Sequence, residues 1–300
     1  MFKRVFLFLA TNLAIMIVLS IAVMIVEKVF GINITGYLGG DYLGLFIFSL
    51  IFGFGGAFIS LFMSKWMAKK AYSIKIIPIS EYDNLNSKQK VVFDVVRELV
   101  EREHIKMPEV GFYNSPEPNA FATGATKNSS LVAVSSGLLQ IMERDAIEGV
   151  IGHEMSHVLN GDMVTMTLLQ GVLNTFVIFF ARIAANIVSQ AVDEKLSGIV
   201  YFITTIVFQI IFGILASLIT MKFSRYREFK ADAGSARFVG KQKMIAGLRA
   251  LKSMQNLAST DDSKLATMKI STKGRKGFMI LFSSHPQLDD RIKALEELNI

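Results

Sequence analysis

Long apolar runs constrain this chain more than any other feature of its sequence. The hydrocarbon core of a bilayer is about 30 Å thick and a helix rises about 1.5 Å per residue, so roughly 20 apolar residues cross it. Four runs reach that length in a chain of 300 residues, 52% of which are hydrophobic. We therefore predict an α-helical membrane protein with four transmembrane helices, at residues 5–26, 43–63, 163–188 and 197–221.

The basic residues beside these runs predict the side of the membrane on which each loop lies. Lys3 and Arg4 precede the first run, as in a signal peptide. However, the run is longer than the about 7–15 apolar residues of such a peptide, and no clear cleavage site follows, so we interpret it as an uncleaved span. Four lysines follow the second run and one precedes it. The positive-inside rule then puts the N-terminus and residues 64–162 and 222–300 in the cytoplasm.

Charge and cysteine content narrow the possible functions. The net charge is +7, which a nucleic-acid-binding protein would explain, but no basic stripe with interleaved aromatic residues is present. Lysine and arginine beside membrane spans account for the charge without a nucleic-acid partner. The chain has no cysteine, which excludes a disulfide framework and thiol catalysis.

A short motif just before the third apolar run, His153-Glu154-Met155-Ser156-His157, matches the pattern H-E-x-x-H. Residues four apart lie on one face of a helix, so both imidazoles can bind one metal ion. Glu154 is rotated by about 100° from His153 and can act as general base toward a metal-bound water. The pattern also occurs by chance in helices, but here it uses two of only four histidines in the chain.

A pair of acids after the fourth apolar run supplies what the motif lacks. Glu228 and Asp232 are four apart and therefore share a helix face. Glu228 can be a third metal ligand, and Asp232 can accept a hydrogen bond from a ligand histidine and fix its tautomer. Alternatively, both acids form ion pairs with neighbouring arginines on a solvated helix beside the membrane. The hairpin of the third and fourth spans begins after the motif and ends before Glu228, so it returns the chain to the same membrane face.

The segments outside the membrane have mixed helix and strand patterns. Residues 88–103 have the periodicity of an amphipathic helix, and residues 110–113 and 131–135 are candidate strands. Between the strands, residues 116–124 are interpreted as a turn that runs into an edge strand, which would lie beside the metal-binding helix. An extended peptide can add to such an edge by β-pairing. The candidate substrate-binding residues on this strand are Ala120 and Phe121.

Five stretches of the sequence resemble the HtpX family of membrane zinc metalloproteases, which are related to the CAAX prenyl proteases. The similarity extends from the first apolar run to the C-terminal helix. One departure is visible: Gln287 follows His285-Pro286, where relatives often have a second proline, and it affects no proposed ligand. The matching stretches are residues 52–56, 63–68, 119–125, 161–167 and 224–236.

The resemblance implies a complete set of site residues. This set contains the ligands of one zinc ion, a catalytic base, an acid behind a ligand histidine, two groups near the oxyanion and one residue beside the bound peptide. The implied zinc ligands are His153, His157 and Glu228, the implied base is Glu154, and Asp232 is the acid behind a ligand histidine. His285 and Arg291 are the implied groups near the oxyanion, and Asn119 is the residue beside the bound peptide.

The predicted architecture is a zincin-like α+β protease domain on the cytoplasmic side, split by a transmembrane hairpin. An N-terminal hairpin covers residues 1–63, the domain covers residues 64–162 and 222–300, and the second hairpin covers residues 163–221. The family implies a zinc endopeptidase of the bacterial inner membrane that degrades misfolded or damaged membrane proteins, often under stress. Its partners are then the lipid bilayer and membrane protein substrates. Two alternatives remain: a prenyl-peptide protease with the same chemistry, and a non-enzymatic membrane chaperone or transporter.

Overall fold

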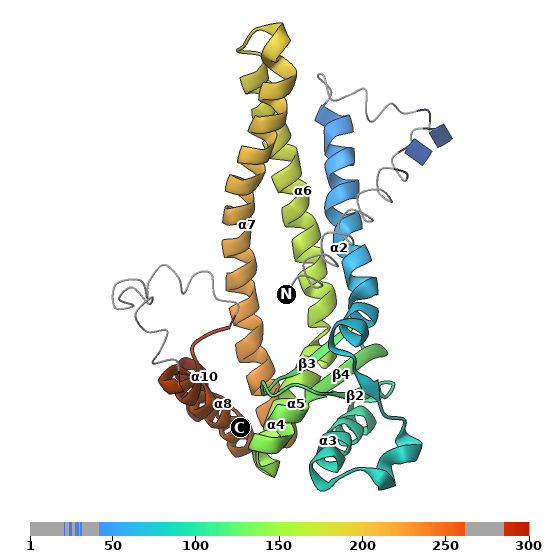
Figure 1. Cartoon of the computed structure of the whole chain (residues 1–300), viewed down its shortest axis with the longest axis vertical. Coiled ribbons are helices and arrows are strands. Elements are labelled where there is room, and N and C mark those ends of the chain that lie inside the picture. The colour runs from blue at the N-terminus through green and yellow to red at the C-terminus, as the bar shows by residue number, and fades with distance from the viewer. Residues whose placement is uncertain are drawn as a thin grey trace. The chain divides into compact units, whose positions relative to one another are not determined.

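The computed structural model describes residues 42–261 and 285–299, together with isolated positions between residues 21 and 31. Apart from such isolated positions, the predicted span at residues 5–26 lies outside the described residues. The chain divides into two compact units. One unit comprises residues 1–63 and 165–220, and the other comprises residues 64–164 and 221–300. Figure 1 labels the helices and strands.

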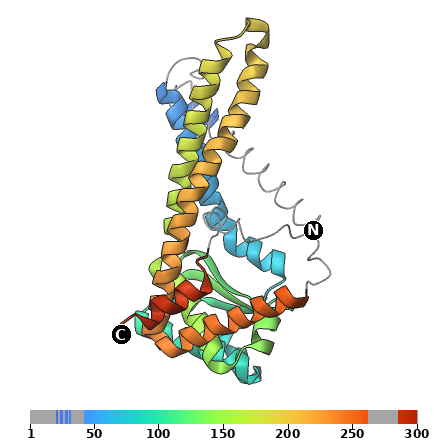
Figure 2. The ribbon, with the colours of Figure 1, turned by 90° about the vertical axis from the view of Figure 1, so that its left-hand side faces the viewer.

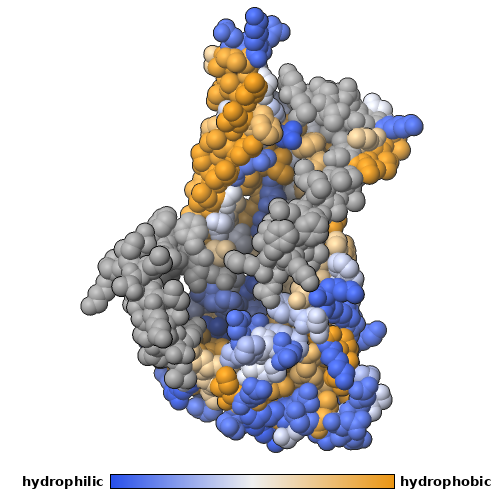
Figure 3. Space-filling view, viewed as in Figure 1, coloured by the Kyte–Doolittle hydropathy of each residue, from blue (hydrophilic) through white to orange (hydrophobic). Residues whose placement is uncertain are grey.

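Three helices in the described part of the chain are long and apolar enough to cross a membrane. Each contains one of the spans predicted after the first. Hydrophobic side chains cover the visible face of the apolar part of α7 (Figure 3). The three helices are α2 (Tyr42–Tyr72), α6 (Asp162–Ser189) and α7 (Glu194–Val239).

In the first unit, α2 and α6 pack closely at small residues. A Cβ added to Gly53 would overlap the side chain of Thr175 on α6. Ser49 and Ala57, one turn to either side of Gly53, are also buried. Small residues let helix backbones approach each other in lipid, where apolar burial alone does not drive association. This contact therefore holds the two helices together.

Helix α7 is longer than the predicted span. Residue 221 ends the apolar run, yet the helix continues without a break to Val239. Basic residues such as Lys222 mark the predicted membrane boundary, but they favour helix as much as the apolar residues before them do. No proline interrupts the segment. The continuous helix carries Glu228 and Asp232 into the second unit.

The second unit contains a four-stranded sheet with the strand order β1-β2-β4-β3. β2 and β4 are parallel, with Val110 opposite Val132, whereas β1 and β3 are antiparallel to their neighbours. Strand β3 therefore lies at an edge, as predicted. The strands are β1 (Lys75–Ile76), β2 (Glu109–Tyr113), β3 (Ala120–Thr126) and β4 (Ser129–Ser135).

Helices pack around this sheet and form two hydrophobic clusters. Val96 of α3 and Ile151 of α5 are fully buried in the larger cluster, which includes strand residues of β2 and β4. The smaller cluster joins α8 to α10 through Leu248 and Leu295, and the two helices lie side by side in Figures 1 and 2. The helices are η2 (Ile79–Asn84), α3 (Ser87–Glu103), α4 (Ser136–Ile141), α5 (Arg144–Asn160), α8 (Lys241–Asp261) and α10 (Leu288–Glu296).

Candidate metal centre

Helix α5 carries the H-E-x-x-H motif. Asp145 lies in its first turn, where an acid suits the helix dipole, and Ile147 and Ile151 anchor its inner face in the core. The helix ends at Gly161, whose φ of 67° lets its N–H bond back to the carbonyl oxygen of His157. Glycine adopts this left-handed conformation without strain. Because α6 begins at the next residue, the chain changes direction immediately after the motif.

Helices α5 and α7 approach closely at small residues. A Cβ added to Gly234 would overlap Ser156 Oγ, and one added to Gly152 would lie 2.6 Å from Ser235 Oγ. Ser235 Oγ also donates a hydrogen bond of 2.8 Å to the carbonyl oxygen of Gly149. The small side chains thus allow α7 to bring its acid pair to the motif.

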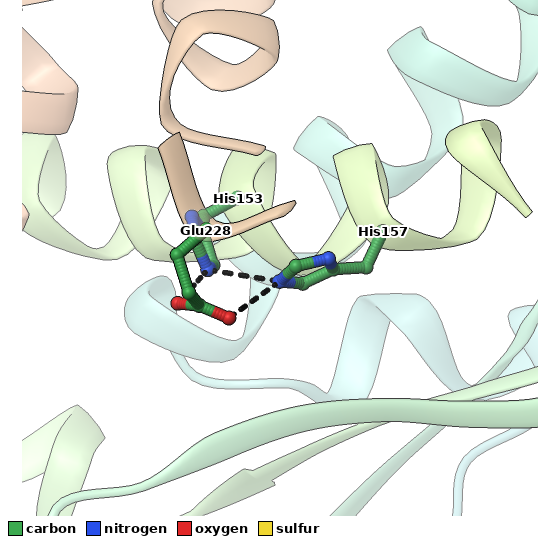
Figure 4. A group of neighbouring side chains, drawn as sticks. All are labelled: His153, His157 and Glu228. Atoms are coloured by element: carbon green, nitrogen blue, oxygen red, sulfur yellow. Dashed lines mark hydrogen bonds and ion pairs between the residues drawn. The ribbon is translucent and has the colours of Figure 1, made fainter. Parts of the chain in front are cut away.

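Three possible ligand atoms from α5 and α7 converge (Figure 4). His153 Nε2 lies 3.2 Å from His157 Nε2, and each of these atoms lies 3.4 Å from an oxygen of Glu228. Two ligands that are each about 2.0–2.1 Å from zinc at a tetrahedral angle are about 3.3–3.4 Å apart. The observed spacing therefore fits one zinc ion.

The other ring nitrogen of each histidine faces a carboxylate. His153 Nδ1 lies 2.8 Å from Asp232 Oδ1, and His157 Nδ1 lies 2.5 Å from Asp162 Oδ2. An ionised carboxylate only accepts hydrogen bonds, so each Nδ1 donates, and the Nε2 of a neutral ring then carries a lone pair. Two lone pairs that face each other at 3.2 Å repel unless a cation lies between them. The donor set thus fits a metal ion and is unsuited to two neutral rings alone.

The carboxylates of the group attract positive charge, as the pKa values show. Burial opposes the charged form of His157, but hydrogen bonds to Asp162 and Glu228 outweigh it and raise the pKa of His157 to about 9. Burial likewise opposes protonation of His153, yet hydrogen bonds to Asp232 and Glu228 raise its pKa. Burial alone would raise the pKa of Glu228, but its histidine partners hold that pKa well below its usual range.

The two residues predicted near the oxyanion both reach the candidate ligands. Arg291, on α10, is 5% exposed, and its Nε and Nη2 donate to the two carboxylate oxygens of Asp232 at 2.7 and 2.6 Å. Its Nη1 lies 3.4 Å from Glu228 Oε2. His285 Nδ1 lies 2.9 Å from the same oxygen, and the side chain of His285 is 64% exposed. Arg291 therefore lies behind the ligands, whereas His285 lies on the solvent side.

Glu154 faces the edge strand. The Ala122 N–H donates a hydrogen bond of 3.0 Å to Glu154 Oε2. In the antiparallel pair of β3 and β4, Ala122 is opposite Val132, and successive residues direct their backbone groups alternately to the partner strand and away from it. The Ala122 N–H therefore belongs to the free edge of the sheet, and this edge faces α5.

The predicted substrate-binding residues differ in the direction of their backbone groups. The Asn119 N–H donates to Ser135 Oγ and its carbonyl oxygen accepts from the Ser135 N–H, both at 2.9 Å. By the same alternation, Phe121 directs its backbone groups to β4 and Ala120 directs its groups to the free edge. Ala120 thus offers its backbone groups to an added strand, whereas Ala122 offers only its carbonyl oxygen because its N–H bonds to Glu154. The backbone groups of Asn119 and Phe121 are already used within the sheet.

Two residues of this group, Asp162 and Arg227, are not among the site residues that the sequence predicts. Arg227 Nη1 donates a hydrogen bond of 3.1 Å to the backbone carbonyl oxygen of Asp162. One signal was available: an acid directly follows the helix-ending Gly161, only five residues after His157. Residues 161–167 are one of the stretches that resemble the HtpX family, but the resemblance implies no role for Asp162.

Known proteins are similar to this chain over most of its length. The profile of peptidase family M48 matches residues 86–299. A protein named Protease HtpX from Tolumonas auensis is 52% identical over 306 aligned residues, with 99% of both chains covered. A Protease HtpX homolog from Bacillus subtilis is 48% identical, again over 99% of both chains. Among solved structures, the crystal structure of S. mikatae Ste24p has a TM-score of 0.62 at 17% identity; the match covers 96% of this chain and 66% of that one.

Proposed function

The chain belongs to peptidase family M48 and is a membrane metalloprotease, and from this premise we propose that it is an endopeptidase that uses one zinc ion to cleave misfolded or damaged membrane proteins. The proposed place of action is the cytoplasmic face of the bacterial inner membrane. A role in the response to membrane stress follows from such substrates.

One observation carries the proposal: two histidine Nε2 atoms lie 3.2 Å apart, and each lies 3.4 Å from a different oxygen of Glu228, among carboxylates that hold the rings in place. We propose His153, His157 and Glu228 as the ligands. A zinc ion at these atoms would supply the Lewis acidity that activates water for attack on a carbonyl.

Glu154 is the proposed general base. The Ala122 N–H holds its Oε2 at 3.0 Å, which fixes the carboxylate and leaves Oε1 to accept the proton of the attacking water. The same oxygen can then return the proton to the leaving amine. A positioned base of this kind contributes about 10²–10⁴-fold to the rate.

The free edge of β3 is the proposed substrate-binding strand. An extended peptide would add to the sheet by main-chain hydrogen bonds to the backbone of Ala120 and to the carbonyl oxygen of Ala122, because the Ala122 N–H already bonds to Glu154. Asn119 and Phe121 would contribute side chains only, since their backbone groups bond within the sheet. The scissile bond would then lie beside Glu154.

His285 and Arg291 have different proposed roles. His285 is exposed and lies 2.9 Å from Glu228 Oε2, so it can donate to the oxyanion that forms beside the ligands. Arg291 is buried, with two of its donors on Asp232, so it holds Asp232 in place behind His153. We propose Arg291 as a positioning residue that acts on the oxyanion only through its charge.

Proteolysis by the purified protein tests the proposal. Casein and a membrane protein should be cleaved, a chelator should stop cleavage, and zinc should restore it. Glu154→Gln should keep zinc but lose most of the activity, whereas Glu101→Gln, an exposed glutamate on α3, should behave like wild type. A folded, zinc-loaded Glu154→Gln protein with near wild-type turnover would contradict the assignment. Cleavage of prenylated peptides but not plain ones would favour the prenyl-peptide alternative.

The cytoplasmic location has its own test. The chain has no cysteine, so a single cysteine can report its surroundings through an impermeant thiol reagent. Ser87→Cys, at the exposed start of α3, should stay unlabelled in intact cells and react after lysis. Labelling in intact cells would reverse the proposed orientation.

A further inference from the structure

Asp162 is a buried acid that contacts a proposed zinc ligand and has no role in the mechanism above. We infer that Asp162 is a positioning residue of the metal centre: it fixes the tautomer and orientation of His157, and Arg227 in turn fixes Asp162. The inference rests on the proposed zinc site and deepens it.

The contact between Asp162 and His157 is short and shielded from water. Asp162 Oδ2 lies 2.5 Å from His157 Nδ1, and Asp162 is 7% exposed. The carboxylate can only accept, so the ring must carry its proton on Nδ1 and present Nε2 to the metal. Outer carboxylates that hold ligand histidines in this way raise their basicity and fix the ring plane.

The turn at Gly161 explains how Asp162 reaches the histidine. The two residues are five positions apart, so a continuous helix would not align them one turn apart. Gly161 instead ends α5 with a φ of 67°, and its N–H bonds to the carbonyl oxygen of His157. Asp162 then begins α6 directly against the last turn of α5.

Arg227 holds Asp162 from α7. Its Nη1 donates a hydrogen bond of 3.1 Å to the backbone carbonyl oxygen of Asp162 and lies 3.8 Å from Oδ2. The side chain of Arg227 is only 15% exposed, so solvent screens this attraction weakly. The next residue, Glu228, is a proposed ligand. Helix α7 therefore supplies one ligand and also supports the residue behind another.

This arrangement joins the two ends of an inserted hairpin at one ligand. Asp162 is the first residue of α6, and Arg227 lies in α7 after the hairpin returns. Loss of Arg227 should therefore disturb His157 through Asp162, although Arg227 itself does not contact the ring in any described interaction.

A simpler role for Asp162 is that of an acid in the first turn of a helix, where it favours the helix dipole. Asp145 provides the matched comparison, since it lies in the first turn of α5 but is exposed. An amide replacement removes the dipole effect equally at both positions. Only at Asp162 does it also weaken the acceptor of a ligand histidine.

Zinc binding to the purified full chain separates the two roles. Chelator competition should show that Asp162→Asn weakens zinc affinity by about 10–100-fold, as loss of an outer carboxylate does, while Asp145→Asn leaves it unchanged. The visible spectrum of the cobalt-loaded protein should shift in Asp162→Asn alone, because the histidine geometry changes. Equal zinc affinity and an unchanged cobalt spectrum in Asp162→Asn would overturn the inference.

A second acid variant guards against misfolding as the cause. Asp162→Glu keeps a carboxylate, so it should bind zinc more tightly than Asp162→Asn. The reverse order would mean that shape, not the acceptor, matters at this position, and it would overturn the inference.

Coupling between the variants tests Arg227. Arg227→Gln should weaken zinc affinity in the wild-type chain but have little further effect in Asp162→Asn, because it acts through the same carboxylate. Arg237→Gln, an exposed arginine on the same helix, should have no effect in either background. Additive effects of Arg227→Gln and Asp162→Asn would show that Arg227 acts independently and would overturn its proposed role.

These results also distinguish the inference from the proposed function. The wild type could bind zinc tightly, lose it in His153→Ala and keep it in Asp162→Asn. That result would refute only the role of Asp162 and leave the proposed zinc site standing. A wild-type protein that binds no zinc would remove both.

Discussion

Raising the pH of the metal-free protein should destabilise it, and His157 is one cause. Hydrogen bonds to Asp162 and Glu228 outweigh burial and raise the pKa of His157 from 6.5 to about 9. A group whose folded pKa lies above its unfolded value stabilises the protein fully below the unfolded pKa. That stability is lost as the pH rises through the folded pKa. The window for His157 therefore runs from about pH 6.5 to about pH 9.

The shift of His157 sets the size of the effect. One pKa unit corresponds to about 1.4 kcal/mol, so this shift corresponds to about 3 kcal/mol of folding free energy. The side chain of His157 is 13% exposed, so solvent screening reduces this value only slightly. About 1 kcal/mol changes the Tm of a domain of 150–250 residues by about 2–4 °C. We therefore expect the Tm to fall by roughly 6–12 °C across the window.

Thermal unfolding in detergent measures this effect, with chelated and zinc-loaded protein compared from pH 6.5 to 9.5. The zinc-loaded protein should show no such fall, because a metal ion replaces the ring protons. Nuclear magnetic resonance of the metal-free chain can follow His157 directly, since the chain has only four histidines. A His157 ring that titrates near 6.5, together with a flat Tm, would refute the reasoning.

Three further predictions concern the ligands, the helix packing and the substrate. Asp232→Ala should lower zinc affinity by about 10–100-fold, and Glu228→Ala should lower it more, because only Glu228 is a proposed ligand. Chelator competition measures both affinities. Wild-type affinity in Glu228→Ala would mean that the third ligand lies elsewhere. Gly149→Ala should lower the free energy of unfolding by about 1–3 kcal/mol, because its Cβ would overlap the backbone carbonyl oxygen of Lys243. Gly213→Ala should not lower it, because its Cβ meets no atom within 4 Å. Equal stabilities of the two variants would contradict this. A cleavable sequence moved stepwise away from a substrate's membrane span should be cut in exposed segments, because a helix in lipid keeps its backbone hydrogen bonds internal. Mass spectrometry maps the products. Cuts at mid-membrane depth would contradict this prediction.

Elements that depend on local chemistry could be predicted from the sequence. The apolar runs at residues 43–63, 163–188 and 197–221 each lie within one long helix. The amphipathic pattern at residues 88–103 coincides with α3 to within a residue. Hydropathy and helical periodicity are properties of neighbouring residues, so a single sequence contains them.

Features that depend on contacts between distant segments were harder to predict. The charged residues after residue 221 predict the end of a span, but the helix they belong to continues to Val239. The contact of Asp162 with His157 depends on a left-handed glycine and on packing against α7. Likewise, nothing near Arg291 in the sequence indicates that its guanidinium bonds to Asp232, 59 residues away.

The charges of the candidate metal centre explain why proton and metal should compete for it. Four carboxylates and two arginines gather around the two histidines, so the group has a net charge of −2 when both rings are neutral. One zinc ion balances that charge, and so do two protonated rings, which is why the pKa values of both histidines are raised. Zinc binding near neutral pH should then release up to about two protons from the rings. The high-pH loss of stability and the zinc affinity therefore have one origin, the excess of negative charge in the fold. The charged residues are Glu154, Asp162, Glu228, Asp232, Arg227 and Arg291.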